Sequence, residues 1–206
     1  MAIMRVAILK RLLVIASVIG VAGVLFGSTA VVMASTANTT ISSVISPVLS
    51  LFTTDGTVDV NVTPTGSGAQ TIASDTVTVS TNDSSGYTLQ LAESSSTTTL
   101  TSGSNTVPAS SGTQTTPVVM AVNTWGYRVD SLGGFGAGTT SAQSNAAISG
   151  SIKFAGVPAS GSPNTLVDTS GTASNATTTV WYGVAANTSQ PTGTYTNTVT
   201  YTATTN

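Results

Sequence analysis

The chain has 206 residues, with five Lys and Arg, seven Asp and Glu, no histidine and no cysteine. Without an imidazole or a thiol, the sequence excludes Ser/His/Asp and Cys/His nucleophilic catalysis, and zinc or copper sites built on His or Cys. Only two basic residues follow position 11, against seven acidic ones, so we expect no nucleic-acid binding, which depends on basic residues at phosphates.

Residues 1–34 have the three parts of an export signal. A basic start (Arg5, Lys10, Arg11) precedes an apolar run and a tail of small residues. The pattern predicts either a signal peptide cleaved after Ala34 or an uncleaved membrane anchor, because residues 12–34 would form a helix about 35 Å long, enough to cross a bilayer. Both alternatives place the rest of a bacterial chain outside the cell and limit membrane contact to this segment.

Residues 35–54 form a lead-in, interpreted as a linker or a first strand. Six apolar residues in it have no obvious place in a sheet: Ile41, Val44, Ile45, Val48, Leu49 and Leu51. A further interpretation is that this segment is donated as a strand to another molecule. Residues 55–206 are expected to form a single domain.

Alternation of apolar and polar residues dominates that domain, and turn residues separate the alternating runs. Strands are predicted at 57–63, 76–80, 87–91, 152–157, 177–185 and 194–204, with a hairpin from 118–122 to 125–129 and a long loop or weak hairpin at 93–117. The pattern predicts an all-β fold, an antiparallel β-sandwich of Ig-like or jelly-roll-like type, preceded by one N-terminal signal or anchor helix.

The inward positions of these strands define the expected core. Its predicted members are Val58, Val60, Val77, Val79, Tyr87, Leu89, Trp125, Tyr127, Phe154, Val180, Tyr182, Val199 and Tyr201.

Candidate chemistry is sparse. The Asp residues mostly stand beside turn residues, where Asp usually bonds to local backbone. The glycine-rich run 133–138 lacks the Lys-Ser/Thr of a phosphate loop and is interpreted as a flexible loop. Asp59 and Asn61 alternate along a strand, but two oxygen ligands do not make a calcium site. We expect no enzymatic activity, no cofactor and no metal.

Two side-chain sets allow alternative interpretations. Lys153 is either an exposed edge-strand lysine that discourages aggregation or the partner of Asn197 in an isopeptide cross-link, as in cysteine-free surface domains of Gram-positive type. Trp125, Tyr127 and Trp181 are either core residues or a platform on which a ligand stacks.

Two stretches resemble bacterial cell-surface β-sandwich proteins, including WxL-type surface domains. They are Asn123-Thr124-Trp125-Gly126-Tyr127 and the segment 184–203, in which Pro191-Thr192-Gly193-Thr194-Tyr195 precedes the last strand. Where a WxL motif has Trp-x-Leu, this chain has Trp181-Tyr182-Gly183. The resemblance implies a cell-surface location and a sandwich architecture.

These observations predict a non-enzymatic extracellular protein that is structural or adhesive, such as a pilin-like, coat or attachment subunit. The alternative is a carbohydrate- or cell-wall-binding module. The expected partner is a component of the cell's own surface or a host surface, or a second copy of the chain.

Overall fold

A computed structural model describes residues 35–137 and 140–206, and the chain divides into two units, 1–44 and 45–206. The expected signal or anchor helix falls on residues 1–34, outside the described residues. Within the described ranges no helix is long and apolar enough to cross a bilayer. Residues 35–44 are exposed and have no regular secondary structure. The described part of the second unit is all-β, its strand pairs are antiparallel, and its one helix is a short 3₁₀ turn at Gly133–Phe135.

The larger sheet is built around two long neighbouring strands, β2 (Ala69–Thr81) and β11 (Ala173–Ala186), which pair over most of their length. β7 (Thr124–Arg128) pairs with the other edge of β11. The far edge of β2 is shared, because β1 (Leu49–Thr53) pairs with its end and β8 (Gln143–Ala146) with its beginning.

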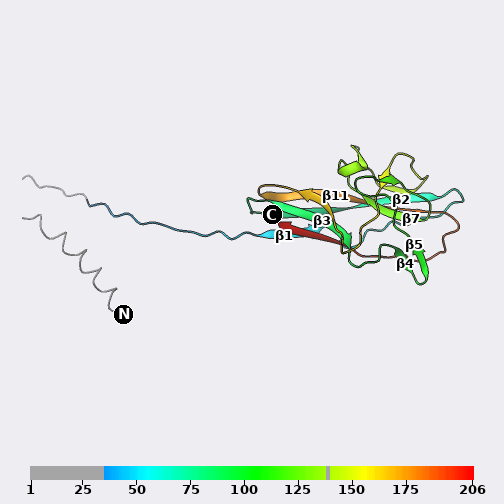
Figure 1. The fold of residues 1–206 in the computed structure, drawn as a ribbon, viewed down its shortest axis with the longest axis horizontal. Coiled ribbons are helices and arrows are strands. Elements are labelled where there is room, and N and C mark those ends of the chain that lie inside the picture. The colour runs from blue at the N-terminus through cyan, green and yellow to red at the C-terminus, as the bar shows by residue number, and fades with distance from the viewer. Residues whose placement is uncertain (1–34, 138–139) are drawn as a thin grey trace, which may run out of the picture. The chain divides into compact units, whose positions relative to one another are not determined.

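The smaller sheet has the order β10 (Asn164–Asp168), β3 (Tyr87–Glu93) and β12 (Val199–Thr205). Two short antiparallel pairs complete the described fold: β4 (Leu100–Ser102) with β5 (Asn105–Val107), and β6 (Val118–Val119) with β9 (Lys153–Phe154). Figure 1 shows β12, in red, beside β1, and the two strands are in contact.

Side chains from both sheets pack into one hydrophobic cluster, in which Val77 and Val180 of the larger sheet join Leu89 and Leu91 of the smaller one. The two sheets are also joined by a hydrogen bond of 2.7 Å between the hydroxyls of Tyr182 on β11 and Tyr201 on β12. Since alternate residues of a strand face opposite sides, both sheets contribute one face to the same core.

A second cluster lies on the opposite face of the larger sheet. It contains Ile72, Met120, Phe154 and Ala185, and Trp181 packs against it. Met120 and Phe154 come from the segments between β5 and β10, so these segments cover the outer face of β2 and β11. The larger sheet is therefore apolar on both faces at the end that contains Ile72 of β2 and Ala185 of β11.

The predicted core is confirmed. Nine of its members are buried: Val77, Val79, Tyr87, Leu89, Trp125, Tyr127, Phe154, Val180 and Tyr182. The other four, Val58, Val60, Val199 and Tyr201, are partly buried and pack against the main cluster.

The predicted hairpin from 118–122 to 125–129 is wrong. β6 pairs with β9, and β7 pairs with β11, with Tyr127 opposite Tyr182. Asn123, with a φ of 58°, separates the two segments, and β7 completes the larger sheet because its apolar face then covers the core. Of the two alternatives for 93–117, a long loop or a weak hairpin, a short hairpin is present, in which β4 pairs with β5.

The predicted strand 57–63 alternates in exposure, as expected, but forms no strand pair among the described residues. The edge of β2 explains this. β1 pairs with this edge from Thr81 to Val77, and β8 pairs with it at Ile72 and Gln70. Val58, Val60 and Val62 therefore pack on the core while their backbone stays outside the sheet. β10 was not predicted, and of the predicted strand 152–157 only Lys153–Phe154 is a strand.

Gly86 is the glycine whose replacement is expected to cost most. Its φ is +90°, and a Cβ there would lie 2.1 Å from the carbonyl oxygen of Thr169. We expect Gly86→Ala to lower the free energy of unfolding by more than about 2 kcal/mol, because left-handed backbone strain and a backbone clash add. Gly103→Ala is the matched control, since Gly103 has a φ of +60° and open space around it. Equal losses for the two variants in urea unfolding would contradict the clash.

Candidate functional site

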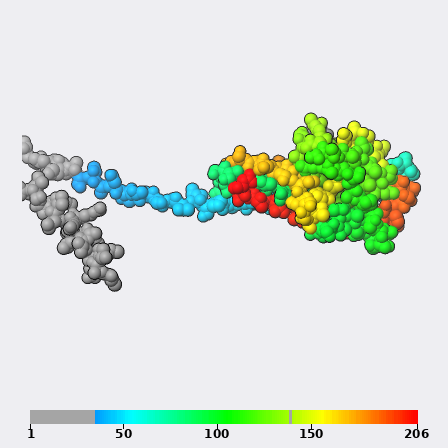
Figure 2. Space-filling model, viewed as in Figure 1, coloured from blue at the N-terminus to red at the C-terminus, as the bar shows by residue number. Residues whose placement is uncertain are grey.

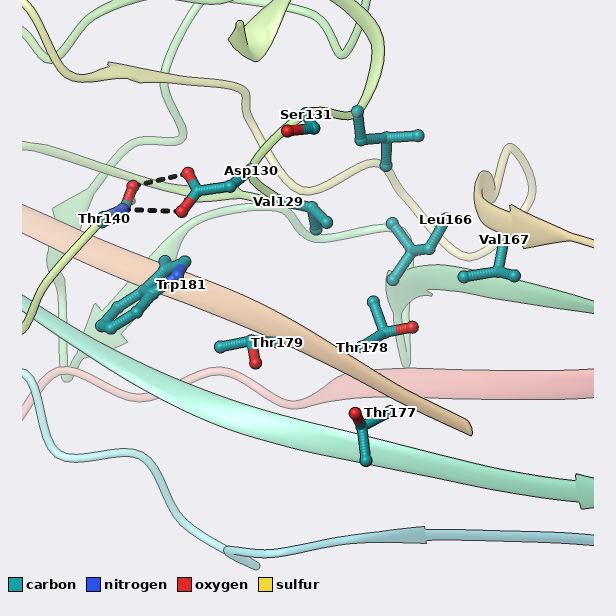
Figure 3. A pocket seen from close by; sticks show the side chains of 11 residues that line it. Val129, Asp130, Ser131, Thr140, Leu166, Val167, Thr177, Thr178, Thr179 and Trp181 are labelled. Atoms are coloured by element: carbon teal, nitrogen blue, oxygen red, sulfur yellow. Dashed lines mark hydrogen bonds between the residues drawn. The ribbon is translucent and has the colours of Figure 1, made fainter. Parts of the chain in front are cut away.

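An open groove of about 540 Å³ runs along β11 beside Trp181 (Figure 3). One wall is β11 itself, with Thr177, Thr179 and the half-buried indole of Trp181. The opposite wall contains Asp130 and the apolar side chains of β10, Leu166 and Val167. We call this site the Trp181 groove. It combines one aromatic ring, several hydroxyls and one carboxylate.

The period of β11 explains why these side chains share the groove. Val180 and Tyr182 belong to the main core, so Trp181 and Thr179 face the other side of the sheet. The second cluster covers this side near Ala185. Trp181, Thr179 and Thr177 therefore stay in contact with solvent and form the β11 wall of the groove.

Asp130 is held rigidly at the groove's edge. Thr140 donates to its carboxylate twice, from the backbone nitrogen at 2.6 Å and from the hydroxyl at 2.7 Å (Figure 3). The Nε of Arg128 donates to the same carboxylate at 2.6 Å. Burial alone would raise the pKa of Asp130, but the bonds from Thr140 and Arg128 and the guanidinium charge outweigh it, so the pKa is lowered. Asp130 is therefore ionised at neutral pH.

Arg128 is buried, although on β7 it alternates with the core residues Trp125 and Tyr127. Its Nη1 donates to the carbonyl oxygen of Phe135 at 2.8 Å, and its guanidinium lies 5.9 Å from the centre of the Phe135 ring. Nη2 also reaches the carbonyl of Gly136. The glycine-rich run, interpreted above as a flexible loop, is thus anchored in its described residues by a buried cation.

The predicted ligand platform is not assembled. Trp125 is only 4 % exposed, and its indole nitrogen donates to the carbonyl of Thr98 at 3.0 Å. Tyr127 is fully buried; its hydroxyl donates to Gln114 and accepts from Asn164, and burial raises its pKa to about 12. Neither ring offers a face to solvent, so both belong to the core interpretation. Of the three aromatic residues, only Trp181 lines a groove.

Lys153 and Asn197 have separate surroundings. Lys153 is exposed on β9, as the edge-strand interpretation expects. The side-chain nitrogen of Asn197 donates to the carbonyls of Thr97 and Thr99 at 2.9 and 3.1 Å, which is the atom that an isopeptide bond would release. Intact mass remains the test of that bond, since the cross-link lowers the mass by one ammonia.

The calcium candidates Asp59 and Asn61 are both exposed. In residues 35–137 and 140–206, no three His, Cys, Asp or Glu side chains gather into a group suited to a metal ion.

Glu93, one of the acidic residues interpreted from the sequence as standing mostly beside turn residues, is instead buried in β3. It is 1 % exposed, and neither carboxylate oxygen has a hydrogen-bond partner among the described residues. Burial raises its pKa from 4.5 to about 7. The signal was present in the alternation, because Glu93 continues the inward series of Tyr87, Leu89 and Leu91 on β3.

Comparison of the chain with protein-family models, with curated proteins and with solved structures returned no match.

Proposed function

We propose that this chain is an exported, non-enzymatic surface protein whose domain is an antiparallel β-sandwich that acts through contact, as a structural or adhesive subunit. The basic and apolar leader supports export. The sandwich is supported by the core that the two sheets share and by the hydrogen bond between Tyr182 and Tyr201. Threonine, serine and asparagine keep the surface hydrated with little charge.

The observation that carries the proposal is the exposure of apolar side chains just before β1. Ile41 and Val44 are each 90 % exposed, Ile45 is 82 % and Val48 is 63 % exposed, and Phe52 on β1 is 53 % exposed. No charged residue occurs between positions 35 and 54. Contiguous exposed apolar residues of this kind mark interaction surfaces. The lead-in is therefore assigned to contact with another molecule.

Protease treatment of intact cells tests the location. We expect an epitope tag placed after Asn206 to be lost when protease is added outside the cell, while a cytoplasmic protein of the same cells stays intact. A tag that survives until the cells are lysed would contradict export and the surface role together.

Carbohydrate binding is the second candidate, and the Trp181 groove favours it. Sugar rings stack their apolar faces on aromatic side chains and bond their hydroxyls to carboxylates and other hydroxyls. Trp181, Asp130 and the Thr177 and Thr179 side chains supply these groups in one groove. In this role the domain would attach to a glycan of the cell wall or of a host surface.

Replacing the indole tests this candidate. With soluble peptidoglycan fragments as the probe, we expect Trp181→Ala to weaken binding about tenfold, about 1.4 kcal/mol, because the stacking surface is lost. Trp181→Phe, which keeps an aromatic face, should retain most of the affinity. Calorimetric titration measures both, and thermal melting checks that each variant is folded. Equal binding by Trp181→Ala and the wild type would exclude the groove.

A further inference from the structure

We propose that the outer edge of β12 takes residues 41–48 of a second copy of this chain as an added strand. The inference rests on the proposed contact function and names its partner. Repeated from copy to copy, this head-to-tail contact builds an open filament or coat, or a ring where the rotation between copies closes.

The hydrogen-bond pattern shows which residues of β12 form its outer edge. The backbone nitrogen of Ser94 donates to the carbonyl of Thr198, and that of Asn206 donates to the carbonyl of Gly86. In an antiparallel pair such hydrogen-bonded positions alternate with open ones. The even-numbered residues of β12 therefore bond to β3. Val199, Tyr201 and Ala203 direct their backbone groups to the outer edge.

That outer edge lacks the features that usually protect an edge strand. β12 has seven residues, VTYTATT, without charge or proline, and its register with β3 is unbroken. Among the described residues, no backbone or side-chain group bonds to the outward backbone groups of Val199, Tyr201 and Ala203. Within the described part of the chain, β12 is therefore an edge strand whose outward backbone groups are unpaired. In Figure 2 its atoms, in red, lie at the surface.

Two other outer strands, β7 and β10, differ from β12. The free edge of β7 is occupied, since Tyr127 and Ala155 exchange two backbone hydrogen bonds of 2.8 and 2.9 Å. β10 has an irregular register between Thr165 and Val167, and the side chain of Gln114 donates to the carbonyl of Thr165. Bulges and covering side chains are two of the ways in which proteins block edge pairing. Such protection is present on these edges and missing on β12.

The core is also incompletely covered beside β12. Val199, Tyr201 and Ala203 pack against the main cluster but are only partly buried, and so are Leu49 and Leu51 of the adjacent β1. One more strand along β12 would cover these side chains. Its inward residues would have to be apolar.

Residues 41–48 have the composition of that strand. Four of them are large apolar residues with 63 to 90 % exposure, and none is charged. The segment is about as long as β12 and pairs with no strand among the described residues. Its single proline, Pro47, is tolerated at the end of an edge strand.

Asn82 holds the end of this segment that adjoins β1 in an extended conformation. Its side-chain oxygen accepts from the nitrogen of Val48 at 2.7 Å, its side-chain nitrogen donates to the carbonyl of Ser46 at 3.1 Å, and its backbone nitrogen donates to the carbonyl of Val48. These bonds reproduce strand pairing beyond the end of β2. The segment is therefore already extended next to β1, which lowers the conformational entropy cost of strand addition.

Engineered cysteines test the contact directly, because the chain has none of its own. One full-length variant carries Thr202→Cys on β12, and a second, of different tag size, carries Ser42→Cys or Ser43→Cys in the lead-in. Neighbouring strands bring facing Cβ atoms within about 5.5 Å, and successive residues face opposite sides. We expect mild oxidation of the mixture to yield the mixed dimer, several-fold faster for one of the two lead-in positions than for the other.

Each other outcome overturns the proposal. Predominant lead-in to lead-in disulfides would show that these segments associate with each other, and predominant Thr202→Cys homodimers would show that β12 edges pair. Absence of any dimer, or equal rates at the two lead-in positions, would exclude an added strand. A folded chain that stays monomeric but is digested on intact cells would leave the proposed surface function standing. A chain that protease added to intact cells does not digest would overturn both the surface function and the strand addition.

A second pair of variants controls for folding. Ile45→Asp is expected to lower mixed-dimer formation at least tenfold, because the charge would have to enter the space beside β1. Thr36→Asp adds the same charge outside residues 41–48 and should leave it unchanged. Both residues are exposed, so neither substitution removes a core contact, and thermal melting should show the wild-type transition for both. Equal dimer formation by the two variants would contradict the assignment of 41–48.

Discussion

Glu93→Gln is expected to stabilise the protein by about 3 kcal/mol at pH 8 and to have little effect at pH 4. The carboxyl is buried, lacks a hydrogen-bond partner among the described residues, and has a pKa of about 7 instead of 4.5. Between pH 4.5 and about pH 7, the carboxyl of Glu93 keeps a proton in the folded chain that it has released in the unfolded chain. The wild type therefore loses unfolding free energy as the pH rises through this window, and the amide, which does not titrate, does not.

Urea unfolding at several pH values measures this difference. Asp59→Asn is the matched control, since Asp59 is exposed, and its effect should stay within about 0.5 kcal/mol at every pH. A difference between Glu93→Gln and the wild type that does not grow from pH 4 to pH 8 would contradict the burial of an unpaired carboxyl.

Arg128→Met is expected to lower the free energy of unfolding by about 3 to 5 kcal/mol at neutral pH, because it leaves the Asp130 carboxylate partly buried without its cation. The substitution also removes the donor to the Phe135 carbonyl and so releases the loop after β7. The loss should diminish in acid. The pKa of Asp130 is lowered in the folded chain, so the stability it provides is present at neutral pH and disappears as the pH falls through that pKa.

Lys153→Met is the matched control, because Lys153 is the other cation of the described part and is exposed. Surface substitutions of this kind usually change stability by no more than about 0.5 kcal/mol. Chemical denaturation of the two variants separates a structural cation from a solvated one. Similar small losses for both would contradict the buried ion pair.

The alternating pattern predicted the all-β class and the core because each inward residue reports on its own strand. Val77, Leu89 and Val180 are inward by local period alone, and the structure buries all three. Pairing could not be predicted in the same way, since β7 joins a strand more than fifty residues away. The sequence contains no signal that distinguishes that partner from the nearer segment 118–122.

The candidate site was harder to predict for a related reason. Arg128 alternates with the core residues Trp125 and Tyr127, so the local period alone would place it on the solvent-exposed face of β7. Met120 and Phe154 cover that side of the larger sheet, and their contacts depend on long connections with no period of their own. Trp181 was identified from the sequence, but its groove depends on how β10 and the loop after β7 lie against β11.

Sedimentation velocity over a range of protein concentrations tests most directly whether the chain acts through contact. The exposed apolar lead-in predicts that wild-type chains assemble into larger species as the concentration rises, and that Ile45→Asp stays at the sedimentation coefficient of a monomer. A single monomeric species for the wild type at every concentration would contradict a lead-in that binds a second copy.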